Sequence, residues 1–150
     1  MNIQNRHVST PFLVLMADDD PDDVSLVSDA LFEAPFSNLF RSVHNGFELV
    51  QYLHGRGKYA VQARPSLILL DLNMPLQNGA EALAEIKSTP GICNIPVVIL
   101  TTSDAERDRL QTVSLGADQY LTKPSSYKAL VKMMQSLQSF HTAHGSRGGN

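Results

Sequence analysis

Along the chain, short continuous runs of hydrophobic residues alternate with longer segments in which polar residues predominate. Residues 67–70 are four consecutive large aliphatics, which can all be buried only where both faces of a strand are covered, as in the middle of a parallel sheet. Runs at 12–17 and 96–100 have the same character. Shorter, weaker patterns at 39–43 and 120–122 complete a predicted set of five strands.

Between these runs, apolar residues recur at the spacing that is typical of helices. Asp20 before Pro21 predicts a capped helix start, and Ser103 or Asp104 is expected to cap the fourth helix. The predicted helices cover 21–34, 47–53, 82 to about 89, the segment up to 114, and 127–140. Strands that alternate with helices in this way predict a doubly wound α/β sandwich with a parallel sheet.

Length and charge bring further limits. The 150 residues fit one domain, which we expect to span 11–140, with a flexible N-terminus at 1–10 and a disordered tail, rich in Gly and Ser, at 141–150. The net charge of −3 offers no basic field for nucleic acid or a membrane surface, and no apolar run is long enough for a bilayer. The lone Cys93 excludes an internal disulfide and suits a reducing compartment. We therefore expect a soluble, cytoplasmic protein.

Chemically active side chains follow the predicted strands at the point where each strand ends. Asp18 and Asp19 follow the first strand, Asp71 the third, Thr101 the fourth and Lys123 the fifth. Carboxyl ends of parallel strands meet at one edge of a sheet, so these groups should share a crevice. Clustered carboxylates repel one another unless a cation lies among them, and an all-oxygen site suits Mg²⁺. A lysine and a hydroxyl beside them suit a phosphoryl group, with Asp71 as the nucleophile.

Each of these residues also has an ordinary structural interpretation. Asp18 and its neighbours cap a helix, Asp71 opens a turn, Thr101 is a turn hydroxyl and Lys123 is a surface cation. Their arrival together at ordered strand ends is what favours a functional site.

These motifs resemble those of the receiver domain of two-component response regulators, over roughly 11–140. The matching segments are Met-Ala-Asp18-Asp19-Asp20, Leu-Leu-Asp71-Leu-Asn-Met-Pro75 with Gly79, Val-Ile-Leu-Thr101, and Gly116 to Pro124. The resemblance implies a flavodoxin-like receiver sandwich with strand order 2-1-3-4-5. It also implies a phosphorylated signalling protein rather than an enzyme, with at most slow self-dephosphorylation.

The resemblance assigns roles residue by residue. It implies that Asp71 accepts the phosphoryl group, that Asp19 is a direct Mg²⁺ ligand and that Asp18 acts largely through water. Asn73 would lend its backbone carbonyl to the metal.

Further roles follow for the other strand ends. Thr101 and Lys123 would contact the phosphoryl oxygens, and the Lys123–Pro124 bond resembles the family's cis peptide. Tyr120 lies where the family places a switch aromatic that moves inward as the Thr101 hydroxyl is drawn to the phosphoryl group.

The whole-chain pattern is similar to stand-alone receivers that are paired with phytochrome-type histidine kinases. We expect phosphorylation by such a kinase or by a phosphotransfer protein, output by contact with a downstream protein, and a homodimer through the last two helices. Two alternatives stay open. One is a receiver-fold adaptor with a vestigial acidic site, and the other is a Mg²⁺-dependent phosphohydrolase that uses the same acids and lysine.

Overall fold

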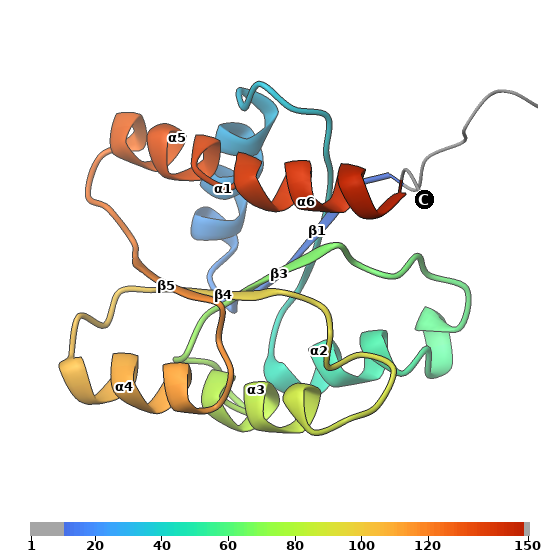
Figure 1. Cartoon of the computed structure of the whole chain (residues 1–150). Helices are drawn as coiled ribbons and strands as arrows, with labels where there is room; N and C mark the ends of the chain where they lie inside the picture. The colour runs from blue at the N-terminus through green and yellow to red at the C-terminus, as the bar shows by residue number, and fades with distance from the viewer. Residues whose placement is uncertain (1–10, 149–150) are drawn as a thin grey trace, which may run out of the picture.

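The computed structural model describes residues 11–148. Its sheet lies between two layers of helices, with α1, α5 and α6 on one side and α2, α3 and α4 on the other (Figure 1). In chain order the elements are β1 (Leu13–Ala17), α1 (Pro21–Phe32), β2 (Leu39–Val43), α2 (Gly46–Leu53), a 3₁₀ turn (Gly57–Tyr59), β3 (Leu67–Leu70), α3 (Gly79–Lys87), β4 (Val97–Thr101), α4 (Glu106–Ser114), β5 (Gln119–Thr122), α5 (Tyr127–Gln135) and α6 (Gln138–Gly148).

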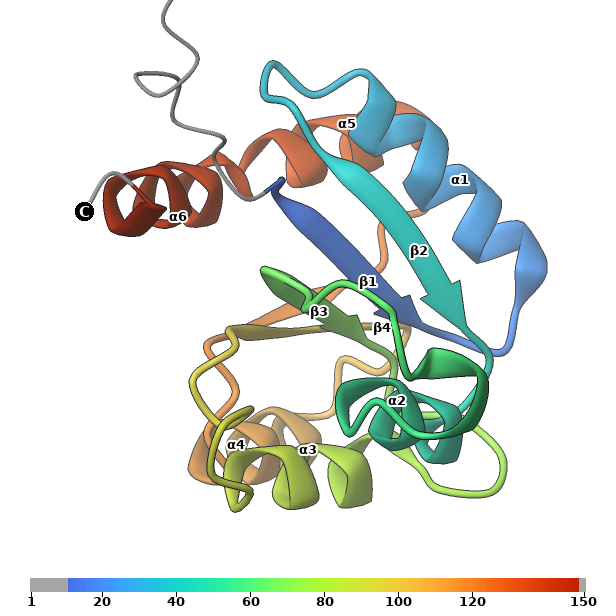
Figure 2. The same cartoon turned by 90° about the vertical axis from the view of Figure 1, so that its right-hand side faces the viewer.

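The sheet has five parallel strands in the order β2-β1-β3-β4-β5. The predicted fold class and strand order are therefore confirmed. The order reverses direction at β1 and β3, which lie side by side, and in open α/β sheets ligands bind outside the carboxyl ends at such a point. The arrowheads of β1 and β2 point toward that edge in Figure 2.

Two hydrophobic clusters, one on each face of the sheet, hold the layers together. Ile68 and Leu70 point into the cluster beneath α2 and α3, whereas Leu67 and Leu69 point into the cluster beneath α1 and α5. All four side chains are fully buried. A run without polar residues is therefore what a strand with two covered faces requires.

Most of the helices begin at a side-chain cap that the sequence supplies. Asp20 accepts a hydrogen bond from the backbone N–H of Asp22 at the start of α1, and Asn78 forms a capping box with Glu81 at the start of α3. Helix α4 differs, because its cap residue is Ala105 and makes no side-chain hydrogen bond. The predicted cap at Ser103 or Asp104 was wrong.

The C-terminal segment differs from the prediction as well. The predicted last helix is divided into α5 and α6, and α6 runs through Gly148, so a disordered tail from 141 is wrong for residues 141–148. The ring of His141 packs 5.3 Å from that of Phe12 and 5.1 Å from that of Phe36. His144 packs 5.5 Å from Phe12. Histidine rings thus supply contacts between α6 and the rest of the domain, and they do not form the aliphatic stripe by which a buried helix is predicted from sequence. Residues 1–10 and 149–150 lie outside the described part of the chain.

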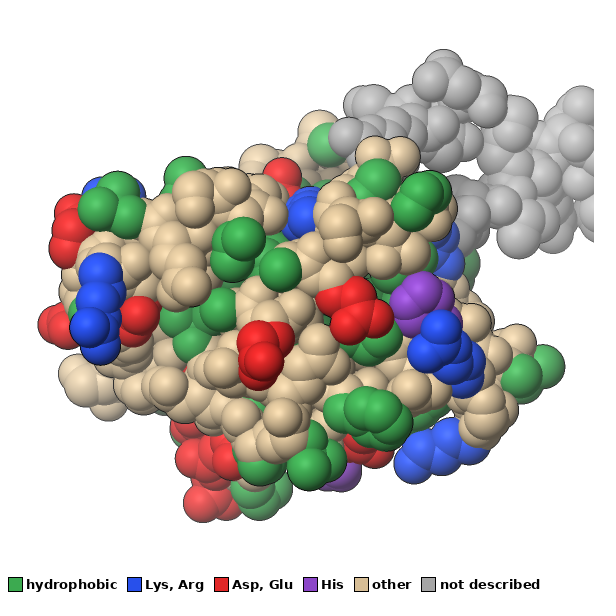
Figure 3. Space-filling view, turned by 90° about the horizontal axis from the view of Figure 1, so that it is seen from below, with side chains coloured by type: hydrophobic (Ala, Val, Ile, Leu, Met, Phe, Trp, Pro, Cys, Tyr) green, Lys and Arg blue, Asp and Glu red, His purple; other side chains and the backbone are tan. Residues whose placement is uncertain are grey.

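Among the described residues, no helix combines the length and the apolar character that crossing a bilayer requires. On the face formed by α2, α3 and α4, acidic and basic side chains are interspersed, and no continuous basic stripe runs across it (Figure 3).

Candidate functional site

The sheet brings the predicted side chains together in two adjacent pairs. Ala17 of β1 is in register with Leu70 of β3, so Asp18 and Asp71, the next residues, emerge side by side. The backbone N–H of Asp71 donates to the carbonyl of Ala17 at 3.1 Å. On the other side of β3, the N–H of Lys123 donates to the carbonyl of Thr101 at 2.7 Å.

The Lys123 ammonium connects these groups. Its Nζ lies 2.6 Å from an oxygen of Asp18, 2.7 Å from one of Asp23 and 3.7 Å from one of Asp71. The side chains of Lys123, Asp18 and Asp71 are 12%, 0% and 8% exposed. A buried ion cluster of this kind requires that its charges compensate one another.

Burial and charge shift the acid–base behaviour of the cluster. Burial raises the pKa of Asp18 above its usual value, although hydrogen bonds from Lys123 and the Asp20 N–H act in the opposite direction. Burial also disfavours the charged form of Lys123. The hydrogen bonds to Asp18 and Asp23 and the charge of Asp71 outweigh that effect, so the pKa of Lys123 is raised. One buried ammonium among several acids is therefore held firmly in its charged form.

A divalent cation fits the same crevice. One carboxylate oxygen from each of Asp18, Asp19 and Asp71 lies within 4.8 Å of the other two. The donors are all oxygens, and Asp19 is exposed, which leaves one side of the group open to water. Hard cations such as Mg²⁺ take carboxylate oxygens and retain part of their water shell.

The loop that follows Asp71 is closed by a glycine. The N–H of Gly79 donates to the Leu72 carbonyl at 3.2 Å, and a Cβ at position 79 would lie 2.1 Å from the Asp71 carbonyl oxygen. Only glycine allows α3 to begin this close to the strand end. Asn73, the predicted carbonyl ligand, is exposed on this loop, and its N–H approaches the Asp71 carboxylate at 3.4 Å.

Thr101 and Tyr120 are linked through one residue of the loop between β4 and α4. The N–H of Ser103 approaches the Thr101 hydroxyl oxygen at 3.4 Å, and the Tyr120 hydroxyl donates to the Ser103 carbonyl at 2.7 Å. Thr101 is fully buried and Tyr120 half-buried. The structure thus connects the predicted switch pair, whose role stays a prediction.

One member of the site was not predicted from the sequence, and one predicted feature is wrong. Asp23, an acid in the first turn of α1, is not among the predicted site residues, yet its carboxylate lies 2.7 Å from the Lys123 ammonium. The described residues contain no cis peptide bond, so the predicted cis bond between Lys123 and Pro124 is wrong in this structure. Trans is the intrinsically preferred isomer even before proline, and Lys123 reaches all its acidic partners with it.

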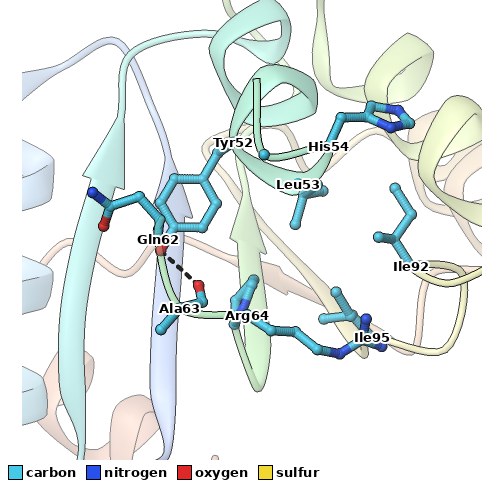
Figure 4. A pocket seen from close by; sticks show the side chains of 10 residues that line it. Tyr52, Leu53, His54, Gln62, Ala63, Arg64, Ile92 and Ile95 are labelled. Atoms are coloured by element: carbon cyan, nitrogen blue, oxygen red, sulfur yellow. Dashed lines mark hydrogen bonds between the residues drawn. The ribbon is translucent and has the colours of Figure 1, made fainter. Parts of the chain in front are cut away.

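A separate cavity of about 210 Å³ lies between α2 and the segments that lead into β3 and β4. Figure 4 shows Tyr52, whose hydroxyl donates to the Ala63 carbonyl at 2.9 Å, together with His54, Arg64 and Ile95. The cavity is near the strand starts, whereas the acidic group follows the strand ends. It contains no carboxylate among its lining residues, so the chemistry described above does not extend to it.

A doubly wound sandwich with a buried lysine and clustered carboxylates at the carboxyl edge of its sheet is an α/β domain whose candidate site lies at the topological switch point. The response regulator receiver domain family matches residues 14–135. The chain therefore belongs to the response regulator receiver domain family.

Particular relatives are similar over most of their length. The chain is 39% identical over 130 residues to response regulator Rcp1 of Synechocystis sp., covering 87% of this chain and 88% of Rcp1. The crystal structure of the phosphorylated cyanobacterial phytochrome response regulator RcpA has a TM-score of 0.82 at 36% identity, covering 87% of this chain and 94% of RcpA. The Mn²⁺-bound form of Rcp1 has a TM-score of 0.80 at 39% identity, with the same coverage.

Proposed function

We propose that this receiver accepts a phosphoryl group on Asp71 from a phosphohistidine of a histidine kinase or a phosphotransfer protein. The observation that carries the proposal is the position of the buried Lys123 ammonium, 2.6 Å from Asp18 and 3.7 Å from Asp71. This arrangement keeps Asp71 beside a fixed positive charge that also suits the oxygens of an incoming phosphoryl group.

The proposed reaction is an in-line displacement at phosphorus. An Asp71 carboxylate oxygen forms the new O–P bond while the P–N bond to the donor imidazole breaks. The imidazole keeps the bonding electron pair and takes up a proton. Lys123 orients the phosphoryl group, and the buried Thr101 hydroxyl donates to one of its oxygens. Catalysis of this kind consists mainly of positioning and electrostatic stabilisation.

Asp18, Asp19, Asp71 and the Asn73 carbonyl would hold a divalent cation, which we propose to be Mg²⁺. When bound, the cation neutralises the acids and draws charge from the phosphoryl oxygens. The chain's own acids fit this purpose, and Rcp1 has been crystallised with Mn²⁺.

The kinase is proposed to be of the phytochrome type, because RcpA is a phytochrome response regulator and Rcp1 is similar over most of this chain. We propose a cytoplasmic protein whose output is contact with another protein through α4 and the last two helices. Leu110 and Val113 of α4 support this, because they are large apolar residues that are 57% and 49% exposed. The same helices α5 and α6 are proposed to support a homodimer.

The test combines intact-mass spectrometry with a small-molecule phosphodonor in the presence of Mg²⁺. The parent protein is expected to gain one phosphoryl group, and Asp71→Asn none. Uptake by Asp71→Asn would refute the assignment. Turnover of phosphate esters well beyond one equivalent would favour a phosphohydrolase instead. A downstream protein bound equally by both forms would favour an adaptor.

A further inference from the structure

Ser103 makes contacts with three different parts of the domain. Its N–H approaches the Thr101 hydroxyl oxygen at 3.4 Å, and its carbonyl accepts the Tyr120 hydroxyl at 2.7 Å. Its own hydroxyl donates to a carboxylate oxygen of Asp108, in the first turn of α4, at 2.6 Å. One half-buried serine thus connects the site hydroxyl, the ring on β5 and the start of a helix.

Helix α4 has little else to hold its beginning in place. Thr112 is its one buried residue, and the Thr112 hydroxyl bonds back to the Asp108 and Arg109 carbonyls of the same helix. The cap residue Ala105 offers no side-chain acceptor. Leu110 points a large apolar side chain to solvent.

The remaining side-chain hydrogen bonds of α4, within the described part of the chain, also stay inside the helix. Arg109 bonds Glu106, and Ser114 bonds the Gln111 carbonyl. The Ser103 side chain therefore ties the start of α4 to the end of β4: its hydroxyl donates to Asp108, and its hydroxyl oxygen accepts the N–H of the cap residue Ala105 at 3.3 Å. The two oxygens of the bond between Ser103 and Asp108 are 2.6 Å apart, and a hydrogen bond of this length from a hydroxyl to a carboxylate is among the stronger ones in proteins.

We propose that Ser103 is a positioning residue that transmits the state of the Asp71 site to α4. The inference rests on the proposed function. When the Thr101 hydroxyl turns to a phosphoryl group, its contact with the Ser103 N–H is exchanged and the Ser103 backbone shifts. Because the Ser103 hydroxyl is hydrogen-bonded to Asp108, Asp108 and the first turn of α4 then shift to a second position. Both ends of this link bias the same two-state element, which is what energetic coupling requires.

The experiment uses beryllium trifluoride with Mg²⁺ as a stable substitute for the phosphoryl group, and records backbone amide NMR spectra of the full chain. The quantity compared is the shift change of the α4 amides relative to that of the amides at Asp71 and Thr101. In the parent protein both groups of amides are expected to shift. Ser103→Ala should keep the shift at the site and lose most of the shift in α4, because the hydroxyl is gone.

Three further variants make the result specific. Ser103→Thr keeps a hydroxyl and is expected to restore the α4 response. Asp108→Ala removes the other partner and should reproduce the loss, which guards against a folding defect peculiar to one variant. Ser114→Ala removes a hydroxyl that bonds only within α4, and should respond like the parent. A purely structural role for Ser103 would not produce this pattern of loss and rescue.

Two results would overturn the proposal. One is an α4 response in Ser103→Ala that equals the parent's while the site still responds. The other is an equal loss in Ser114→Ala. If the amides at Asp71 and Thr101 of the parent do not respond to the additive, the proposed function itself fails and the coupling falls with it.

Discussion

Lys123→Met removes the one positive charge that the described residues place among the acids of the site, and it keeps most of the side-chain volume. The ammonium lies 2.6 Å from Asp18, which is fully buried, and 3.7 Å from Asp71, which is nearly so. Removing one partner of a buried ion pair costs about 3–5 kcal/mol, because the other charge is left uncompensated. The third partner, Asp23, is 30% exposed and finds water instead. We therefore expect a loss near the lower end of that range, roughly 3 kcal/mol at pH 7.

The loss should depend on pH in a defined direction. Burial already raises the pKa of Asp18, and removing the ammonium raises it further, so the native variant binds protons more readily than the unfolded chain. Its stability must then rise as the pH falls. In the parent, Lys123 gives a dependence of the same sign, but at the alkaline end of the pH range. Because the pKa of Lys123 is raised, its contribution is complete below the usual lysine pKa and is lost only as the pH rises through the higher value.

The assay is urea unfolding in the presence of a chelator, at pH 5 and at pH 7, with Lys128→Met as the matched control. Lys128 is exposed, and its substitution should change the free energy of unfolding by less than about 0.5 kcal/mol. Lys123→Met should be clearly less stable than the parent at pH 7, with a smaller deficit at pH 5. A Lys123→Met deficit no larger than that of the control, or equal at both pH values, would refute the reasoning.

Three further changes have defined outcomes. Gly79→Ala puts a Cβ 2.1 Å from the Asp71 carbonyl oxygen. It should lower the free energy of unfolding by about 1–3 kcal/mol and slow phosphorylation. A variant with parental stability and phosphorylation rate would contradict the close approach. Leu76 has a φ of 67° and is 81% exposed. Leu76→Gly relieves backbone strain and should raise the free energy of unfolding by up to about 1 kcal/mol in the same urea assay. A lower free energy of unfolding would show that the leucine side chain contributes more than the strain costs. A hydrogen bond to Glu33 raises the pKa of Tyr127 from 10.0 to about 12. The contribution of this bond to stability is therefore complete below pH 10 and is lost as the pH rises through the raised pKa of Tyr127. Alkaline ultraviolet titration should therefore lose its latest tyrosine step in Tyr127→Phe, and an unchanged curve would argue against the bond.

The central strands and the location of the site could be predicted because single physical rules govern them. Residues 67–70 have no polar member, and a strand buried on both faces needs none. Because β1, β3, β4 and β5 are parallel, residues that follow them had to emerge at one edge. Asp18 and Asp71 could thus be paired from the sequence, although they are far apart in the chain.

Contacts between a strand end and a helix were harder to predict. Asp23 lies at a helix start, where an acid is favourable in any case, so nothing in the local sequence indicated its bond to Lys123. The contact at the start of α4 was equally hard to predict. Serine is a common helix cap, but the Ser103 hydroxyl donates to the side chain of Asp108 instead. The part of α6 beyond residue 140 was missed because its contacts come from histidine rings such as His141 rather than from an aliphatic stripe.

We propose that the phosphoryl group is carried by the carboxylate of Asp71 itself. The direct measurement is to phosphorylate the parent protein with a small-molecule donor and Mg²⁺, reduce the acyl phosphate with borohydride, and sequence the peptides by mass spectrometry. An acyl phosphate on Asp71 is expected to be reduced to the alcohol homoserine, so homoserine should appear at position 71 and only after phosphorylation. Homoserine at Asp18 or Asp19, or a phosphorylated protein with an unmodified residue 71, would contradict the claim.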